Sequence, residues 1–206
     1  MTADYNLTAV EIQLHSTGKG KGVDMNQGEC VRHYVNTLIG WVELRVSNRA
    51  VRSVRFIEEP EFPQLASTSA VMEQLVLELD SYFMGNLKVF SIQLEEQPGT
   101  PFQRRVWEKL QEIPYGETRS YSEVAQTAGN PNAARAVGLA NGSNIIPIII
   151  PCHRVIKSDG SLGGYGPGPH IKKKLLELEG IELVTRRAGK TVQQSPSSVS
   201  GSGFTV

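Results

Sequence analysis

The sequence has little of what marks a secreted or membrane-bound protein. Only two cysteines, Cys30 and Cys152, occur in 206 residues, which is too few for a disulfide framework and typical of a reducing compartment. No segment reaches the about 18 consecutive apolar residues of a membrane span, and acidic residues stand where a signal peptide would have its apolar core. These absences predict an intracellular protein, cytoplasmic or nuclear, that is not secreted and does not bind a membrane.

Net charge is also lacking, because 21 basic and 21 acidic residues balance. Their distribution along the chain is uneven. Residues 37–100 contain five basic and nine acidic side chains, whereas residues 101–174 contain ten basic and five acidic ones. This split favours a basic working face on the second segment, as nucleic-acid binding requires. Charges scattered over a solvated surface are the alternative.

The two ends of the chain have the composition of linkers. Residues 1–36 are polar, and we expect a flexible extension there. Its Gly18–Gly22 stretch lacks the Gly-Lys-Ser/Thr ending of a phosphate-binding loop. Residues 186–206 are rich in Ser and Gly and predict a disordered tail.

Residues 37–97 have the patterns of a small α/β unit. Apolar and polar residues alternate over 40–46 and again over 51–56, with a turn at Asn48-Arg49, which predicts a strand pair. Apolar residues at helical spacing over 70–84 predict an amphipathic helix ended by Gly85. Residues 89–94 are expected to form a further strand.

Residues 98–185 favour helices. The first runs over 102–110. Ser120 and Glu123 then form a capping-box pattern for a helix over 121–128. Asn130 and Pro131 fit the N-cap and first position of another helix that ends at Ala140, so the spacing is that of a helix-turn-helix. Small residues with one long side chain, Arg135, suit a narrow DNA groove, although a helix packed inside the protein would look the same.

An apolar strand bounded by prolines, residues 145–151, runs directly into Cys152 and His153. A lone cysteine is usually a small core residue, but the polar residues that follow favour a nucleophile. Ionising a free thiol at pH 7 needs roughly 2 kcal/mol, which a nearby His, Arg or helix N-terminus could supply. On a regular strand His153 would point away from Cys152, so it can assist only if the chain turns there or a water bridges the two.

Several of these residues together resemble one family. The motifs are Pro151-Cys152-His153-Arg154-Val155, the helix-turn-helix segment from Ser120 to Gly138, Asn144, the glycines around Tyr165, and residues 175–180. They look like the O6-alkylguanine-DNA alkyltransferases, also called methylated-DNA–protein-cysteine methyltransferases, and the resemblance covers about residues 38–182. It implies an N-terminal α/β RNase H-like domain (37–97) and a mainly helical, winged-helix-like catalytic domain with the helix-turn-helix (98–185).

The resemblance also implies the catalytic roles. Cys152 would accept the alkyl group, His153 would deprotonate it through a water, and Glu179 would orient the imidazole. Tyr121 would donate a proton to the departing guanine or polarise it, and would press on the DNA backbone. Asn144 would hold the turn and position the cysteine.

For DNA, the resemblance implies that Arg135 takes the place of the flipped base. The expected DNA-binding residues are Ser120, Tyr121, Ala134 and Arg135. The expected guanine pocket consists of Val155, Ser161, Gly163, Gly164 and Tyr165.

The implied function is DNA repair by stoichiometric, irreversible transfer of the alkyl group of O6-alkylguanine to Cys152 after base flipping, with O4-alkylthymine an open second substrate. The partner would be duplex DNA and the protein a monomer without cofactor. We expect no structural zinc, because His15, Cys30 and His33 make no recognisable tetrahedral set. Two alternatives are a lesion-binding relative without chemistry, which would lack the acceptor cysteine, and a cysteine hydrolase, which would need a histidine distant in sequence.

Overall fold

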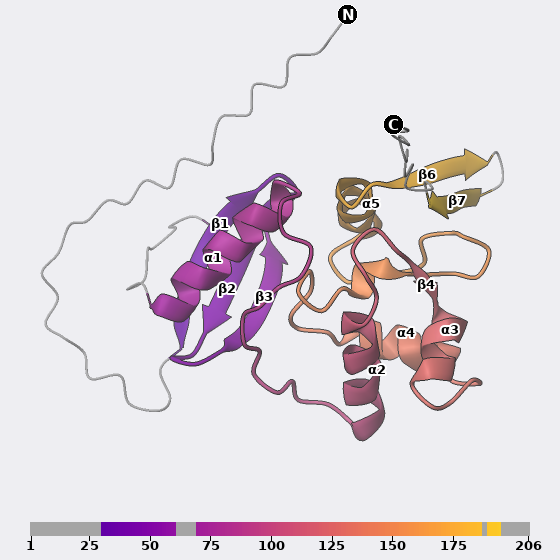
Figure 1. Cartoon of the computed structure of the whole chain (residues 1–206), viewed down its shortest axis with the longest axis horizontal. Coiled ribbons are helices and arrows are strands. Elements are labelled where there is room, and N and C mark those ends of the chain that lie inside the picture. The colour runs from indigo at the N-terminus through magenta and orange to yellow at the C-terminus, as the bar shows by residue number, and fades with distance from the viewer. Residues whose placement is uncertain (1–29, 61–68, 187–188, 195–206) are drawn as a thin grey trace, which may run out of the picture.

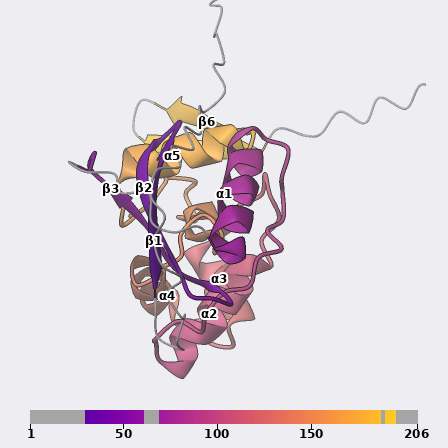
Figure 2. The same cartoon turned by 90° about the vertical axis from the view of Figure 1, so that its left-hand side faces the viewer.

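The first part of the protein is a three-stranded antiparallel sheet with one helix on it. The computed structural model describes residues 30–60, 69–186 and 189–194 (Figure 1). Strands β1 (Val31–Thr37), β2 (Gly40–Val46) and β3 (Val51–Ile57) pair in sequence order. Helix α1 (Ala70–Phe83) lies along one face of this sheet, as both cartoon views show (Figure 2). The two predicted strands and the predicted helix are confirmed.

The alternating pattern explains why this layer forms. In β2 the buried Val42 and Leu44 lie opposite Phe56 and Val54 of β3. The buried stripe of α1 includes Met72, Leu75, Leu79 and Tyr82. Burial of such side chains stabilises the contact by about 1.5–3 kcal/mol each. These side chains belong to one apolar core that continues into the helical half, and Tyr82 lies where α1 meets that half.

Two predictions for this unit were wrong. The expected flexible extension is wrong for residues 31–36, which lie in β1, where Val31 and Val35 are buried; residues 1–29 lie outside the described residues. The expected strand over 89–94 does not form beyond a single bridge between Leu94 and Val51. Instead, the carboxylate of Glu78 accepts hydrogen bonds from the Ser91 and Ile92 amides, at 2.9 and 3.3 Å. A side chain thus takes the place of a neighbouring strand.

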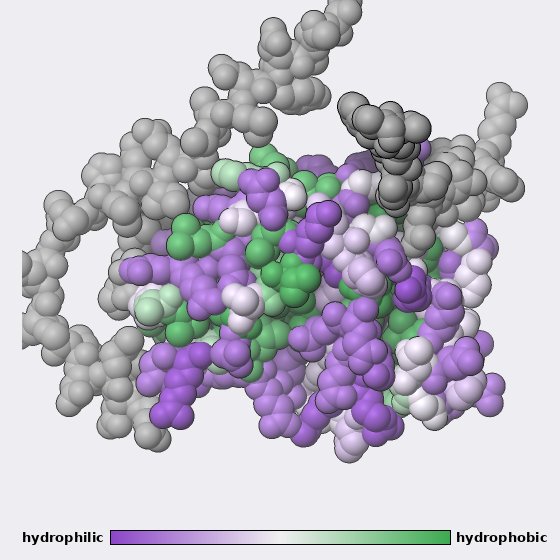
Figure 3. Space-filling model, viewed as in Figure 1, coloured by the Kyte–Doolittle hydropathy of each residue, from purple (hydrophilic) through white to green (hydrophobic). Residues whose placement is uncertain are grey.

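The second part consists of short helices and two small strand pairs. Its elements are α2 (Pro101–Gln111), β4 (Arg119–Ser120), α3 (Tyr121–Thr127), α4 (Ala134–Gly142), the 3₁₀ helix η1 (Cys152–Arg154), β5 (Val155–Ile156), α5 (Pro169–Leu178), β6 (Ile181–Arg186) and β7 (Gly189–Gln194). Strand β4 pairs in parallel with β5. On the face shown in Figure 3, hydrophilic residues cover the surface over α2. None of the helices in the described part of the chain is long and apolar enough to span a bilayer.

The helix-turn-helix pair begins as predicted and then differs. Ser120 and Glu123 form the expected capping box at the start of α3. The next helix was expected to begin at Pro131 but begins at Ala134, with Ala133 as an N-cap that offers no side-chain hydrogen bond. Asn130 is used in a turn instead: its Oδ1 accepts from the Asn132 amide and its carbonyl from the Ala133 amide. The first helical turn of α4 therefore keeps unpaired amides at the surface.

Two further segments correct the sequence interpretation. Residues 189–194, placed in the predicted disordered tail 186–206, form β7 and pair antiparallel with β6 from Ile181↔Gln194 to Arg186↔Gly189. Residues 146–151 are buried as expected, whereas Ile145 is 38% exposed, and the segment is a loop and not a strand. The Ile150 amide donates to the Ile146 carbonyl at 3.0 Å, and Ile148 has a positive φ of 75°. Such a φ is rare for a β-branched residue, so tertiary packing holds this turn.

Candidate active site

The chain turns at the cysteine. Cys152 is the first residue of η1, and its amide donates to the Ile150 carbonyl at 2.8 Å. The Arg154 amide donates to the Pro151 carbonyl at 2.9 Å. Because this backbone is not a strand, Cys152 and His153 are not forced onto opposite faces. The chain therefore turns at this point, which is one of the two conditions under which we expected His153 to be able to assist Cys152.

Asn144 fixes the position of the sulfur. Its Nδ2 donates to the Ile150 carbonyl at 2.9 Å and to Sγ of Cys152 at 3.1 Å. Its Oδ1 accepts from the Ile146 amide at 3.0 Å. One side chain at the end of α4 thus closes the loop on both sides and holds the cysteine that follows it.

The thiol is protonated at rest. Cys152 is only 4% exposed, and burial raises its pKa above the ordinary value. The hydrogen bond from Asn144 and the charge of Lys172 lower the pKa by less than burial raises it. The raised pKa favours the neutral thiol at rest, so a base must remove the proton during the reaction.

His153 is suited to be that base. Its side chain and that of Glu179 are fully buried, and Nε2 lies 2.8 Å from Oε1 of Glu179. Burial lowers the pKa of His153, so the ring is neutral at neutral pH. Because a carboxylate can only accept, we assign the ring proton to Nε2. Nδ1 is buried and has no hydrogen-bond partner among the described residues, so it keeps a lone pair for a proton.

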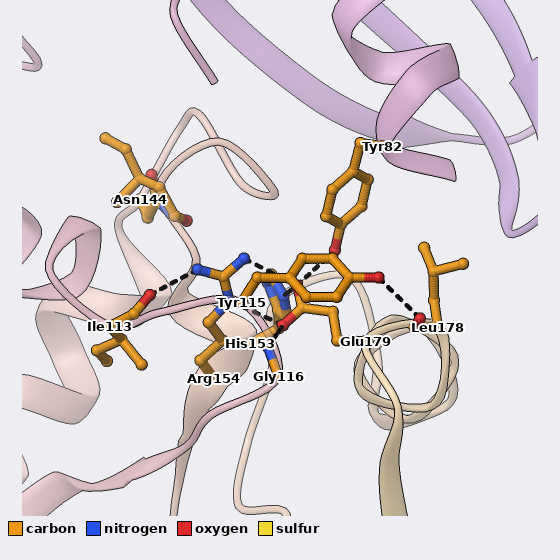
Figure 4. A network of polar contacts seen from close by, with 10 residues as sticks. Tyr82, Ile113, Tyr115, Gly116, Asn144, His153, Arg154, Leu178 and Glu179 are labelled. Atoms are coloured by element: carbon orange, nitrogen blue, oxygen red, sulfur yellow. Dashed lines mark hydrogen bonds and ion pairs between the residues drawn. The ribbon is translucent and has the colours of Figure 1, made fainter. Parts of the chain in front are cut away.

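Glu179 is anionic because several donors surround it. Burial alone would raise its pKa, but hydrogen bonds and charge from His153 and Arg154 lower it to about 2. Arg154 donates through Nε and Nη2 at 2.9 and 3.0 Å, and its Nη1 donates to the Ile113 carbonyl at 2.6 Å. The phenol of Tyr82 donates at 2.7 Å, and the Gly116 amide at 3.2 Å. Figure 4 shows these groups converging on the one carboxylate.

Lys172 is a charged residue of the site that the sequence interpretation missed. It is fully buried in α5, donates to the carbonyl of Val155, and lies 3.5 Å from that of Gly164. Burial lowers its pKa to about 8. Residues 171, 172, 175, 176 and 179 form the buried stripe of this segment, and that helical spacing was the available signal. It was hidden because Lys172 is followed by two more lysines.

Two of the predicted pocket residues, Gly163 and Gly164, adjoin Tyr121, which is half-buried at the start of α3. The Tyr121 hydroxyl lies 3.4 Å from the Gly164 carbonyl, and a Cβ on Gly163 would lie 2.9 Å from the same hydroxyl. The hydroxyls of Ser161 and Tyr165 are buried without a partner in the part of the chain that is described. Burial, and then the charge that Cys152 would carry, raise the pKa of Tyr121, so its phenol keeps a proton that it can donate.

The predicted DNA-binding residues lie on the surface. Arg135 is exposed in the first turn of α4, next to the half-buried Ala134. The Ser120 hydroxyl accepts from the Glu123 amide at 3.2 Å. The structure therefore brings Cys152, His153, Glu179 and Asn144 into one buried group and leaves Arg135 outside it.

No group of three or more potential metal ligands (His, Cys, Asp or Glu) occurs among the described residues. Of the three residues considered for zinc, Cys30 is exposed and His33 is half-buried in β1. His15 lies outside the described residues.

A cysteine next to a buried His–Glu pair, beside two short packed helices, defines a helix-turn-helix protein with a nucleophilic thiol. Comparison with known proteins agrees. Residues 101–181 match the family described as 6-O-methylguanine DNA methyltransferase, DNA binding domain. A methylated-DNA–protein-cysteine methyltransferase of Methanosarcina acetivorans is 47% identical over 147 residues, which cover 71% of this chain and 84% of the relative. The chain therefore belongs to the methylated-DNA–protein-cysteine methyltransferase family.

Solved structures support the same assignment. The crystal structure of a Mycobacterium tuberculosis O6-methylguanine methyltransferase has a TM-score of 0.65 at 44% identity and covers 73% of this chain and 93% of its own. A Mycobacterium tuberculosis relative solved in complex with DNA has the same TM-score and identity, with 72% and 91% covered.

Proposed function

We propose that this protein repairs DNA by moving the alkyl group of O6-alkylguanine onto Cys152, once per protein molecule. The observation that carries the proposal is the sulfur itself, which Asn144 holds at 3.1 Å beside the buried His153–Glu179 pair. The names of the relatives support the same reaction, because they describe methyl transfer from DNA to a protein cysteine. A lesion-binding relative without chemistry would not need this arrangement.

The groups present account for each proton and bond. The Cys152 thiol gives its proton, through a bridging water, to Nδ1 of His153, and Glu179 stabilises the imidazolium that forms. The thiolate attacks the alkyl carbon, a carbon–sulfur bond forms, and the bond from that carbon to O6 breaks. Its electron pair goes to the guanine, which Tyr121 protonates or polarises.

The product explains why one chain repairs one lesion. A thioether has no good leaving group, and its release would need a second nucleophile at the site. The other cysteine of the chain, Cys30, is exposed just before β1, in the α/β unit. The alkylated protein is therefore an end product.

For DNA binding, we propose that α3 and α4 enter the duplex as a unit. An alkyl group on O6 is inaccessible inside stacked DNA, so the nucleotide has to be flipped out at a cost of a few kcal/mol. Arg135 is exposed on α4, and its insertion into the stack would offset part of this cost. The ten basic residues of 101–174 suit a phosphate backbone. Duplex DNA containing O6-alkylguanine is the proposed partner of a monomer, which would act in a cytoplasm or a nucleus.

We also propose a division of labour between two domains. Residues 37–97, together with β1, would form the RNase H-like domain, and residues 98–185 the winged-helix-like catalytic domain. The sheet covered by α1 and the group of helices α2 to α5 that follows it support this division, and the two halves share one apolar core.

Intact-mass spectrometry after mixing with a duplex that contains O6-methylguanine tests the function. We expect a gain of one methylene mass, localised to the peptide that holds Cys152. Cys30→Ser is the matched control and should gain the same mass, whereas Cys152→Ser should gain none. Methylation of any other residue, or binding without a mass change in the unmodified sequence, would contradict the proposal.

A further inference from the structure

We propose that Tyr82, supplied by α1 of the α/β unit, is a positioning residue for alkyl transfer: its phenol holds the Glu179 carboxylate and so sets how strongly that carboxylate holds His153. This inference rests on the function proposed above and assigns part of the reaction machinery to the unit that carries no nucleophile.

The contact joins segments that are distant in sequence. Tyr82 and Glu179 lie 97 positions apart, and the phenol oxygen is 2.7 Å from Oε1 of Glu179. Oε1 of Glu179 also lies 2.8 Å from Nε2 of His153. In Figure 4 the Tyr82 ring descends from α1 toward the carboxylate, on the side opposite the backbone of η1. The Tyr82 phenol is therefore one hydrogen bond away from Glu179, the group that orients His153.

The hydroxyl is not explained by packing. Tyr82 is fully buried in an aromatic cluster, with ring centroids 5.4 Å from Phe83, 5.5 Å from Phe90 and 6.0 Å from Tyr115. A phenylalanine would fill the same space. A buried hydroxyl costs free energy unless it is hydrogen-bonded, and here its partner is a charged acceptor, the stronger kind of bond. The oxygen thus adds an interaction with the Glu179–His153 pair (the relay) that the ring alone cannot make.

The chemical consequence follows from sharing one acceptor. Oε1 of Glu179 accepts hydrogen bonds from Tyr82, His153 and Nη2 of Arg154. Each donor withdraws electron density from this oxygen. Without the phenol, the carboxylate would bind the imidazolium more tightly, which raises the pKa of His153. The carboxylate would also lose one of the bonds that fix its rotation. The first effect moves the pH at which His153 becomes protonated, and the second slows transfer.

The other ionisable groups around the pair stay in place. Arg154 from η1 and Lys172 from α5 both lower the pKa of His153 by their charge. Tyr115, before β4, donates to the Leu178 carbonyl at 2.9 Å and not to Glu179. Cys152, next to His153 in η1, is neutral at rest because burial raises its pKa. A change at Tyr82 therefore reaches His153 through Glu179, the acceptor that the two side chains share.

The test is the pH profile of single-turnover transfer from a duplex containing O6-methylguanine. For Tyr82→Phe we expect methylation of Cys152 to persist, with a plateau rate roughly ten- to a hundredfold lower, as the loss of one hydrogen bond to a charged group implies. We expect the acid limb, where His153 becomes protonated, to move up by roughly half to one pH unit. Tyr115→Phe deletes the same hydroxyl from a neighbouring ring and should leave the acid limb in place.

A fluorotyrosine placed at position 82 gives a second test that preserves the fold. Its more acidic phenol donates more strongly, so the acid limb should move down, opposite to Tyr82→Phe. If the acid limb is the same in wild type and in both position-82 variants, or moves equally in Tyr115→Phe, the positioning role is wrong. Failure of the wild-type protein to methylate Cys152 would instead contradict the proposed function itself.

Discussion

The loop that carries the nucleophile and the helix pair that faces DNA are organised in opposite ways. In the loop from Asn144 to Arg154, side chains bind the backbone and one another at 2.6–3.1 Å. Helix α4, in contrast, begins without a side-chain cap and presents Arg135 to solvent. The reacting groups are thus placed before any substrate arrives, whereas the recognition surface keeps donors for a partner to use.

The energetic reason is the cost of burial. The Glu179 carboxylate accepts five hydrogen bonds because an unpaired buried charge would unfold much of the local structure. The exposed amides of α4 are solvated by water and cost little. Preorganisation is needed where charge develops during the reaction, and an exposed helix end is sufficient where an anionic backbone will bind.

The largest expected effect tests the loop at its centre. Cys152→Ala should abolish alkyl transfer and leave duplex binding within about twofold, because the thiol is only 4% exposed and adds almost nothing to the surface that faces DNA. Transfer of a labelled methyl group and a binding titration at fixed salt measure the two effects. Label on the Cys152→Ala protein would mean that another residue is the acceptor.

Next in size is the loss of the relay carboxylate. Glu179→Gln leaves Arg154 buried without its counter-charge and should lower the free energy of unfolding by about 3–5 kcal/mol. Glu78→Gln is the matched control, since Glu78 also accepts several hydrogen bonds but lies near the surface. Urea unfolding at pH 7 compares them, and equal losses would show that burial is not what distinguishes the two carboxylates.

The same carboxylate predicts a pH dependence. The pKa of Glu179 is about 2 in the folded protein and 4.5 ordinarily. A carboxyl with a depressed folded pKa contributes stability that is fully present above pH 4.5 and is lost as the pH falls toward about 2. Between those pH values the wild type should therefore lose more stability than Glu179→Gln. Parallel acid titrations followed by circular dichroism would refute the argument if the two proteins lost equal stability.

A smaller, substrate-dependent effect tests the helix pair. Arg135→Ala should slow transfer from duplex DNA by roughly ten- to a hundredfold, because flipping costs a few kcal/mol, while transfer from the free alkylguanine base stays unchanged. Arg49→Ala, which removes an exposed charge from the α/β unit, controls for net charge. If transfer from duplex DNA and from the free base slowed equally, the proposed insertion of Arg135 into the base stack would be wrong.

The smallest expected effect lies at the start of α3. Ser120→Ala removes the cap of that helix and should cost about 0.5–2 kcal/mol of stability, with little change in transfer from the free base. Ser122→Ala removes a hydroxyl from the same helix without affecting the cap. Thermal melts of the two variants measure the difference, which should vanish if Ser120 acts only through DNA.

Features that depend on neighbours along the chain were predictable from the amino-acid sequence. The capping box at Ser120 was predicted because its two partners are three positions apart. The alternating strands β2 and β3 and the stripe of α1 were predicted from local periodicity. Cys152 and His153 stood out as a motif for the same reason, since adjacent residues can be recognised together.

The other features depend on how the chain packs, because partners that are distant in sequence override local preference. The pattern of residues 89–94 predicted a strand, but the Glu78 carboxylate accepts hydrogen bonds from the Ser91 and Ile92 amides. Asn130 was predicted to cap the following helix, but its side-chain and backbone oxygens accept hydrogen bonds within a turn instead. Tyr82 is local to α1 in sequence and joins the relay only when the fold brings it within 2.7 Å of Glu179. Hydrogen bonds act over a few ångströms of space, and separation along the chain says nothing about them until the core has packed.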